Sequence, residues 1–171
     1  KFLNEFPTSP YAEKVSSYLV EVYMNTRSYD AALKSIDRIA KPSAQILEAK
    51  QKILFQLGTQ SFANADFEQA LKYLNQSIAI GQYNRQTKAD AYYWCGESYY
   101  RLNRMVEAAR DFNAYLQLTT QPNNEMYALA NYNLGYIAFH RKDYTQASNY
   151  FQKYVQLEKG ENATTLADAY N

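Results

Sequence analysis

A pattern of small and large residues recurs along this chain with a period of 38 or 39 residues. Its centre is a column of four alanines, Ala32, Ala70, Ala108 and Ala147. A large apolar residue follows each alanine by four positions, and these are Ile36, Leu74, Phe112 and Phe151. Twelve positions before the alanine stand Val20, Gly58, Gly96 and Gly135. A period in this range is typical of stacked units of secondary structure, in which each unit contacts only its neighbours.

Within one period the apolar residues follow helical spacing and do not alternate as in a strand. In the third unit, one face is formed by Tyr92, Cys95, Gly96 and Tyr99. After a short polar break at residues 101–104, a second face is formed by Met105, Ala108, Ala109, Phe112 and Leu116. The spacing therefore predicts two helices in each unit. Glycine inside a helix costs about 1 kcal/mol relative to alanine, so we expect the glycine and alanine columns to meet where two antiparallel helices approach closely.

Helix ends have recognisable spacing as well. Asp66 with Gln69, and Asp143 with Gln146, have the spacing of a capping box and predict the starts of second helices. Thr87 with Asp90 predicts the start of a first helix in the same way. Two glycines, Gly81 and Gly160, are expected to form left-handed caps just beyond second helices.

These columns resemble the tetratricopeptide repeat, whose motif reads W-x2-L-G-x2-Y, then A-x3-F, then P. The unit from Ala89 to Pro122 matches it best, with Tyr92, Cys95, Gly96, Tyr99, Ala108 and Phe112 at the motif positions. The resemblance covers nearly the whole chain. It implies an all-α fold, a right-handed superhelical solenoid of antiparallel helix pairs. The period exceeds the usual 34 residues by about one helical turn per unit, which fits either longer helices or longer loops.

We therefore expect one repeat domain over residues 1–171, with units at about 13–46, 51–84, 89–122 and 128–161. Partial repeats are expected at both ends, because Ala167-Asp168-Ala169-Tyr170 repeats Ala89-Asp90-Ala91-Tyr92. The opening segment, residues 2–12, is similar to a repeat junction of bacterial envelope tetratricopeptide proteins. That similarity favours the periplasm or cell envelope over the cytoplasm.

Charge and composition exclude several classes of function. The net charge is +1 with both signs interspersed, so nucleic acid is not an expected partner. No apolar run approaches the roughly 18 residues that a membrane-spanning helix needs. The single histidine, His140, and the single cysteine, Cys95, are too few for a histidine-based metal cluster or a Ser-His-Asp arrangement. We expect Cys95 to pack and His140 to lie at a helix end near solvent. We expect no enzymatic activity and no cofactor in this segment.

The resemblance implies a binding face on the first helices, because family members turn positions five, nine and twelve of each unit toward the concave groove. In this chain those positions are Phe55, Thr59 and Phe62, then Tyr93, Glu97 and Tyr100, then Tyr132, Tyr136 and Phe139. One interpretation is an aromatic groove for an extended or helical peptide. The other is that many of these rings pack between neighbouring repeats.

The leading functional hypothesis is a protein–protein interaction scaffold that binds a peptide or a partner protein in this groove. The alternative is a regulatory or targeting repeat segment of a larger enzyme or signalling protein. A third possibility is self-association through apolar faces that the ends of such an array expose.

Overall fold

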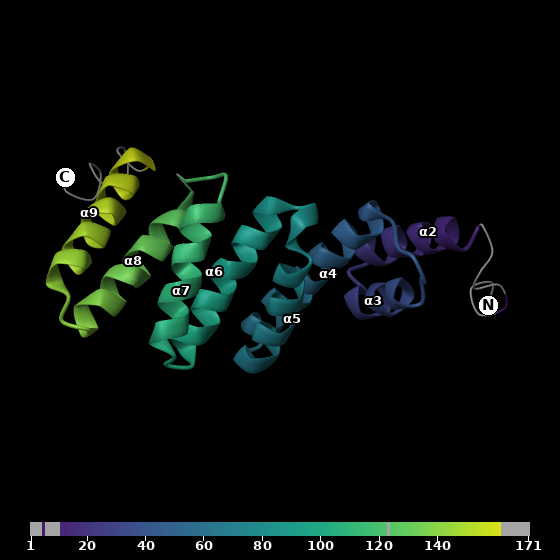
Figure 1. Ribbon diagram of the computed structural model, residues 1–171, viewed down its shortest axis with the longest axis horizontal. Coiled ribbons are helices and arrows are strands. Elements are labelled where there is room, and N and C mark those ends of the chain that lie inside the picture. The colour runs from purple at the N-terminus through teal and green to yellow at the C-terminus, as the bar shows by residue number, and fades with distance from the viewer. Residues whose placement is uncertain (1–4, 6–10, 123, 162–171) are drawn as a thin grey trace.

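The computed structural model describes residue 5 and residues 11–122 and 124–161. Within these residues all regular secondary structure is helical, which confirms the all-α prediction. The helices form a row of consecutive pairs (Figure 1): α2 (Ala12–Asn25) with α3 (Tyr29–Asp37), α4 (Ala44–Ala63) with α5 (Phe67–Ala79), α6 (Arg85–Arg101) with α7 (Met105–Leu118), and α8 (Glu125–His140) with α9 (Tyr144–Glu161). The recurrence at residues 167–170 and the opening residues 2–4 and 6–10 lie outside the described part of the chain.

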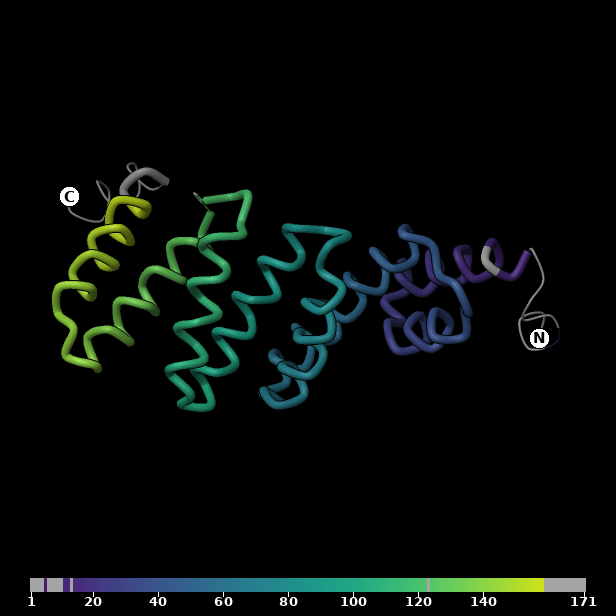
Figure 2. The backbone as a smooth tube through the Cα atoms, in the orientation of Figure 1, coloured from purple at the N-terminus to yellow at the C-terminus, as the bar shows by residue number. Residues whose placement is uncertain are grey.

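Helix packing follows the order of the chain. The two helices of a pair pack closely on each other, and the second helix of each pair also packs on the first helix of the next, as α5 does on α6 and α7 on α8. The backbone tube in Figure 2 shows the same progression from the first pair to the last. The predicted solenoid of antiparallel helix pairs is confirmed.

The first helices are long, and the segments that join one pair to the next have five or six residues, at 80–84 and 119–124. Helices α4, α6 and α8 have 20, 17 and 16 residues. Asn84 begins α6, because its backbone is extended and its side-chain oxygen accepts the Thr87 amide at 2.9 Å. The predicted start at Thr87 is therefore wrong. At the starts of the second helices, the Asp66 and Asp143 side chains accept hydrogen bonds from the backbone N–H groups of Gln69 and Gln146. Each bond is 3.2 Å long, as the capping spacing predicts.

Among the described residues, left-handed backbone occurs between the two helices of a pair and not between one pair and the next. Positive φ values recur with the sequence period at Arg27, Ala65, Asn103 and Lys142, with values of 56°, 59°, 59° and 62°. In the second pair, the Ala65 amide donates to the Phe62 carbonyl and the Asp66 amide to the Ser61 carbonyl, both at 2.9 Å. These two bonds form a Schellman motif that ends the first helix.

The expectation for the two glycine caps is wrong. No described glycine has positive φ. Gly81 lies in a 3-10 turn, η1 (Gly81–Tyr83), which continues the chain after α5, and Gly160 lies within α9.

Each repeated glycine of a first helix lies against the large apolar side chain of the second helix in the same pair. A methyl carbon on Gly96 would lie 2.8 Å from two ring carbons of Phe112, and one on Gly135 would lie 2.8 Å from the Phe151 ring. A methyl carbon on Gly58 would likewise lie 2.6 Å from the Leu74 Cγ atom. The same carbon on Gly58 would lie 3.4 Å from the Ala70 carbonyl oxygen, so the glycine also approaches the alanine column. The close approach makes room for the large side chain, while Ala70, Ala108 and Ala147 are buried beside it.

Replacing Ala65 by glycine should stabilise the protein. An L-residue in the left-handed region costs roughly 1–2 kcal/mol. Glycine avoids this cost, but its greater conformational freedom in the unfolded chain lowers stability by roughly 0.4–1 kcal/mol. We expect a net gain of about 0.5–1 kcal/mol, measured as a higher urea midpoint. Asn103→Gly is the matched control and should gain less, because asparagine tolerates this region better. An unchanged or lower midpoint for Ala65→Gly would contradict the assignment.

Replacing Gly96 by alanine should destabilise the protein, although alanine is the better helix former. The added methyl group overlaps the Phe112 ring, which is fully buried. Overpacking of this kind costs roughly 1–3 kcal/mol, which exceeds the gain of about 1 kcal/mol in helix propensity. Gly81→Ala is the control, because its new methyl group meets mainly the flexible Lys88 chain. Thermal melts that rank Gly96→Ala at or above Gly81→Ala would argue against this contact.

Candidate protein-binding face

The position-five residues face the second helix of their own pair. The Tyr93 ring is 3% exposed and packs edge-on against Phe112 and Tyr115, with centroid distances of 5.8 and 5.4 Å. Tyr132 makes the equivalent contacts with Phe151 and Tyr154, at 5.8 and 5.2 Å. The prediction that the Tyr93 ring lines an open groove is wrong, because this column belongs to the core of the helix pair.

The three members of this column differ in how well they are covered. Phe55 is half-buried against the main apolar core. Tyr132 is 43% exposed, although it makes the same ring contacts as the buried Tyr93.

The position-nine residue Glu97 connects two helix pairs. Its Oε1 atom accepts a hydrogen bond from the Tyr93 hydroxyl at 3.0 Å and another from Asn133 Nδ2 of α8 at 2.7 Å. Burial first, and then the adjacent Glu97 carboxylate, raise the pKa of the Tyr93 hydroxyl, so Tyr93 stays a donor to Glu97. Thr59, at the same position of α4, instead donates to the Gln56 carbonyl of its own helix.

The position-twelve residues form the open part of the face. Phe62 contacts Trp94 of the next pair at a centroid distance of 5.0 Å. Tyr100 meets Tyr136 across the next boundary, at 6.2 Å. The third member, Phe139, is 51% exposed. The rings therefore follow one another along α4, α6 and α8, and their exposure increases toward α8.

Four residues that the sequence analysis missed complete this surface. Trp94 and Asn133 each follow a position-five residue, and Arg101 and His140 each follow a position-twelve residue. The Arg101 guanidinium carbon lies 5.8 Å from the centre of the Phe62 ring, and the His140 ring lies 4.4 Å from that of Tyr136. Successive helical residues are roughly 100° apart, so the next position along each stripe was the available signal. His140 ends α8 and is exposed, as predicted.

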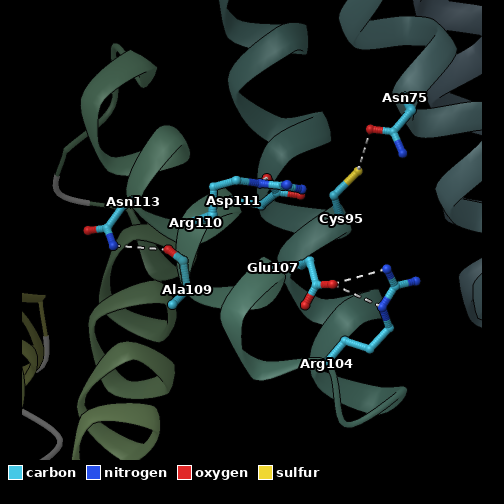
Figure 3. Close-up of polar contacts among 8 residues, drawn as sticks. All are labelled: Asn75, Cys95, Arg104, Glu107, Ala109, Arg110, Asp111 and Asn113. Carbon is cyan, nitrogen blue, oxygen red and sulfur yellow. Dashed lines mark hydrogen bonds and ion pairs between the residues drawn. The ribbon is translucent and has the colours of Figure 1, made fainter.

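Figure 3 shows a second set of polar contacts, on α7 and on the helices beside it. Cys95 is buried and its thiol lies 3.9 Å from Asn75 Oδ1. Burial raises the pKa of the Cys95 thiol, which disfavours the reactive thiolate. Asp111 is 1% exposed and accepts a 2.9 Å hydrogen bond from Arg110, and burial raises the pKa of its carboxyl group. Cys95 therefore packs, as predicted.

Two further kinds of feature are absent from the described residues. No group of three or more His, Cys, Asp or Glu side chains there is placed to hold a metal ion. None of the described helices combines the length and the apolar character needed to cross a membrane.

Several solved structures have a similar fold. A crystal structure of MamA is 18% identical, covers 92% of this chain and 85% of that chain, and gives a TM-score of 0.60. A MamA RS-1 double mutant is 16% identical, with coverages of 92% and 81% and a TM-score of 0.55. A putative kinesin light chain of Podospora anserina with TPR-like repeats is 11% identical, with coverages of 91% and 79% and a TM-score of 0.51. At these identities the likeness shows the fold alone.

No curated protein sequence matches the chain significantly. Two family models described as tetratricopeptide repeat match residues 55–125 and 128–160. Together they cover more than half of the sequence, in the same units whose helix pairs are described above. The chain belongs to the tetratricopeptide repeat family.

Proposed function

We propose that this chain is a protein-interaction scaffold that binds a peptide segment of a partner protein across the first helices α6 and α8. The observation that carries the proposal is the contact between Tyr100 and Tyr136, which joins two repeats into one aromatic surface. Tyr136 is 39% exposed and Phe139 is 51% exposed at its α8 end. A contiguous exposed apolar patch of this kind marks an interaction site more often than scattered apolar residues do.

The residues of the face divide into contact and supporting groups. The rings of Phe62, Trp94, Tyr100, Tyr136 and Phe139 supply the anchors, since aromatic side chains carry much of the binding energy in interfaces. Phe55, Tyr93 and Tyr132 hold the first helices against their second helices and so position those anchors.

Glu97 supplies a hydrogen-bond acceptor for the bound segment. Both of its hydrogen bonds use Oε1, so Oε2 can accept an N–H of the bound segment. Because Tyr93 and Asn133 fix the carboxylate between α6 and α8, its orientation is set before the partner binds, which reduces the entropy lost on binding.

Side-chain truncations should separate the open rings from the core. Phe112→Ala should lose about 3–5 kcal/mol of stability, because the ring is fully buried. Tyr93→Ala should behave similarly, because its ring is 3% exposed. Tyr136→Ala should lose about 1 kcal/mol or less, because its ring is partly in solvent. The urea midpoints of the three variants and the parent give the order of stability loss. A loss for Tyr136→Ala as large as that for Phe112→Ala would remove the reason for treating this ring as an open anchor.

Peptide selection tests the binding face directly. Peptides selected from a phage-displayed library on the parent chain should bind Tyr136→Ala at least about tenfold more weakly, since a hot-spot residue contributes roughly 2 kcal/mol. Val106→Ala is the control, because Val106 is 70% exposed on α7, away from this face. Fluorescence anisotropy measures each affinity. Selected peptides that bind both variants equally well would contradict the proposal.

A further inference from the structure

A cleft of about 260 Å³ lies within the chain, between the third and fourth helix pairs, where α7, α8 and α9 meet. Its floor is apolar and consists of the buried side chains of Leu134, Ile137 and Ala138 on α8. Leu134 and Ala138 each stand two residues from Tyr136, which places them roughly 200° around the helix from it. This Ala138 cleft therefore opens on the side of α8 opposite the proposed peptide-binding face.

Two large side chains fill the same place one repeat earlier. Tyr99 of α6 stands 39 residues before Ala138, and Leu71 of α5 stands 38 residues before Ala109 of α7. Tyr99 and Leu71 are both buried members of the main apolar core. Ala109 and Ala138 line the cleft in their stead. The space is therefore what remains when the positions of a tyrosine and a leucine both hold alanine.

The ring of Tyr99 shows which kind of side chain fits this place. The guanidinium carbons of Arg104 and Arg110 lie 4.9 and 5.7 Å from the centre of that ring. In the Ala138 cleft a guanidinium is again available, because Arg141 lines the cleft and takes part in no ion pair among the described residues. A guanidinium is attracted to the negative face of an aromatic ring.

The charges at the rim of the cleft favour a neutral occupant. Arg141 and Asp143 both line the cleft and carry charges of opposite sign. The Asp143 carboxylate also accepts a hydrogen bond from the backbone N–H of Gln146 at 3.2 Å, which holds it at the start of α9. A charged side chain would therefore meet a like charge at one side of the rim, whereas a phenol ring carries no charge to repel.

Polar groups in the wall of the cleft suit a hydroxyl group. Asn113 of α7 donates through Nδ2 to the Ala109 carbonyl at 2.9 Å, which leaves its Oδ1 atom as an acceptor. The Tyr150 hydroxyl of α9 lies 3.5 Å from that Oδ1 atom, which is longer than the roughly 2.5–3.0 Å of a good O–H···O bond. A hydroxyl that enters between them can donate to Asn113 and accept from Tyr150.

We propose that the Ala138 cleft binds the side chain of a tyrosine from a partner peptide. Its phenol ring lies on the apolar floor with the Arg141 guanidinium at one face, and its hydroxyl lies between Asn113 and Tyr150. An engineered apolar cavity of roughly 150 Å³ binds benzene, so a cleft of about 260 Å³ has room for the larger phenol. The site lies across α8 from the aromatic face and does not rest on the function proposed for that face.

Titration with three acetylated and amidated tripeptides, followed by heteronuclear NMR spectroscopy, tests the proposal. The tripeptide Ala-Tyr-Ala should bind saturably and shift the side-chain amide signals of Asn113 and Gln146. Ala-Phe-Ala should bind roughly two- to tenfold more weakly, because it lacks one hydrogen bond. Ala-Leu-Ala should bind more weakly still, because it also lacks the ring. A phenylalanine or leucine peptide that binds as tightly as the tyrosine peptide, or a tyrosine peptide that causes no saturable shift, would overturn the proposal.

Variants that refill the cleft give a second test. Ala138→Tyr restores the side chain of Tyr99 and Ala109→Leu restores that of Leu71, so each should weaken binding of the tyrosine peptide at least about tenfold by a steric clash. Neither should lower the melting temperature, because the added side chain enters existing space. Val106→Tyr, at an exposed position of α7 outside the cleft, is the control and should bind like the parent. A lower melting temperature for both filled variants would show that the space is absent and would overturn the proposal.

Two further variants separate this site from the aromatic face. Tyr136→Ala should keep the parent's affinity for the tyrosine tripeptide, and Ala138→Tyr should keep the parent's affinity for peptides selected on the aromatic face. Asn113→Ala should remove the preference for the tyrosine over the phenylalanine tripeptide, because the acceptor for the hydroxyl is lost. Loss of tripeptide binding in Tyr136→Ala, or an unchanged preference in Asn113→Ala, would overturn the proposal without affecting the function proposed for the other face.

Discussion

The close contact between a glycine of the first helix and a large side chain of the second is the constraint on which the other features depend. Gly96 leaves no Cβ where the Phe112 ring lies, and the same relation joins Gly135 to Phe151. Because dense packing tolerates neither a void nor an overlap, this contact fixes the distance and rotation of the two helices. That rotation decides which residues of the first helix turn inward, toward the next repeat or toward solvent.

Each first helix therefore serves three surfaces at once. In α6, Tyr93 packs into its own pair, Cys95 lies against the preceding pair near Asn75, and Tyr100 lies on the open face. Glu97 links these surfaces, since it accepts one hydrogen bond from the Tyr93 hydroxyl and another from the side-chain amide of Asn133 in the next repeat. The proposed binding face is thus built on side chains that also pack the helices, which explains why few of its rings are fully exposed.

The repeat period predicts the helix pairs, their order and the caps at Asp66 and Asp143, because each depends on local spacing. The side toward which a residue of the first helix faces is less accessible from sequence. Positions five, nine and twelve lie within roughly 60° of one another around a helix, yet one edge of that stripe meets the paired helix and the other meets solvent. Tyr93 and Tyr100 therefore look alike in sequence and differ in burial. The left-handed residue Ala65 gives no signal either, because backbone hydrogen bonds and not its side chain hold that turn.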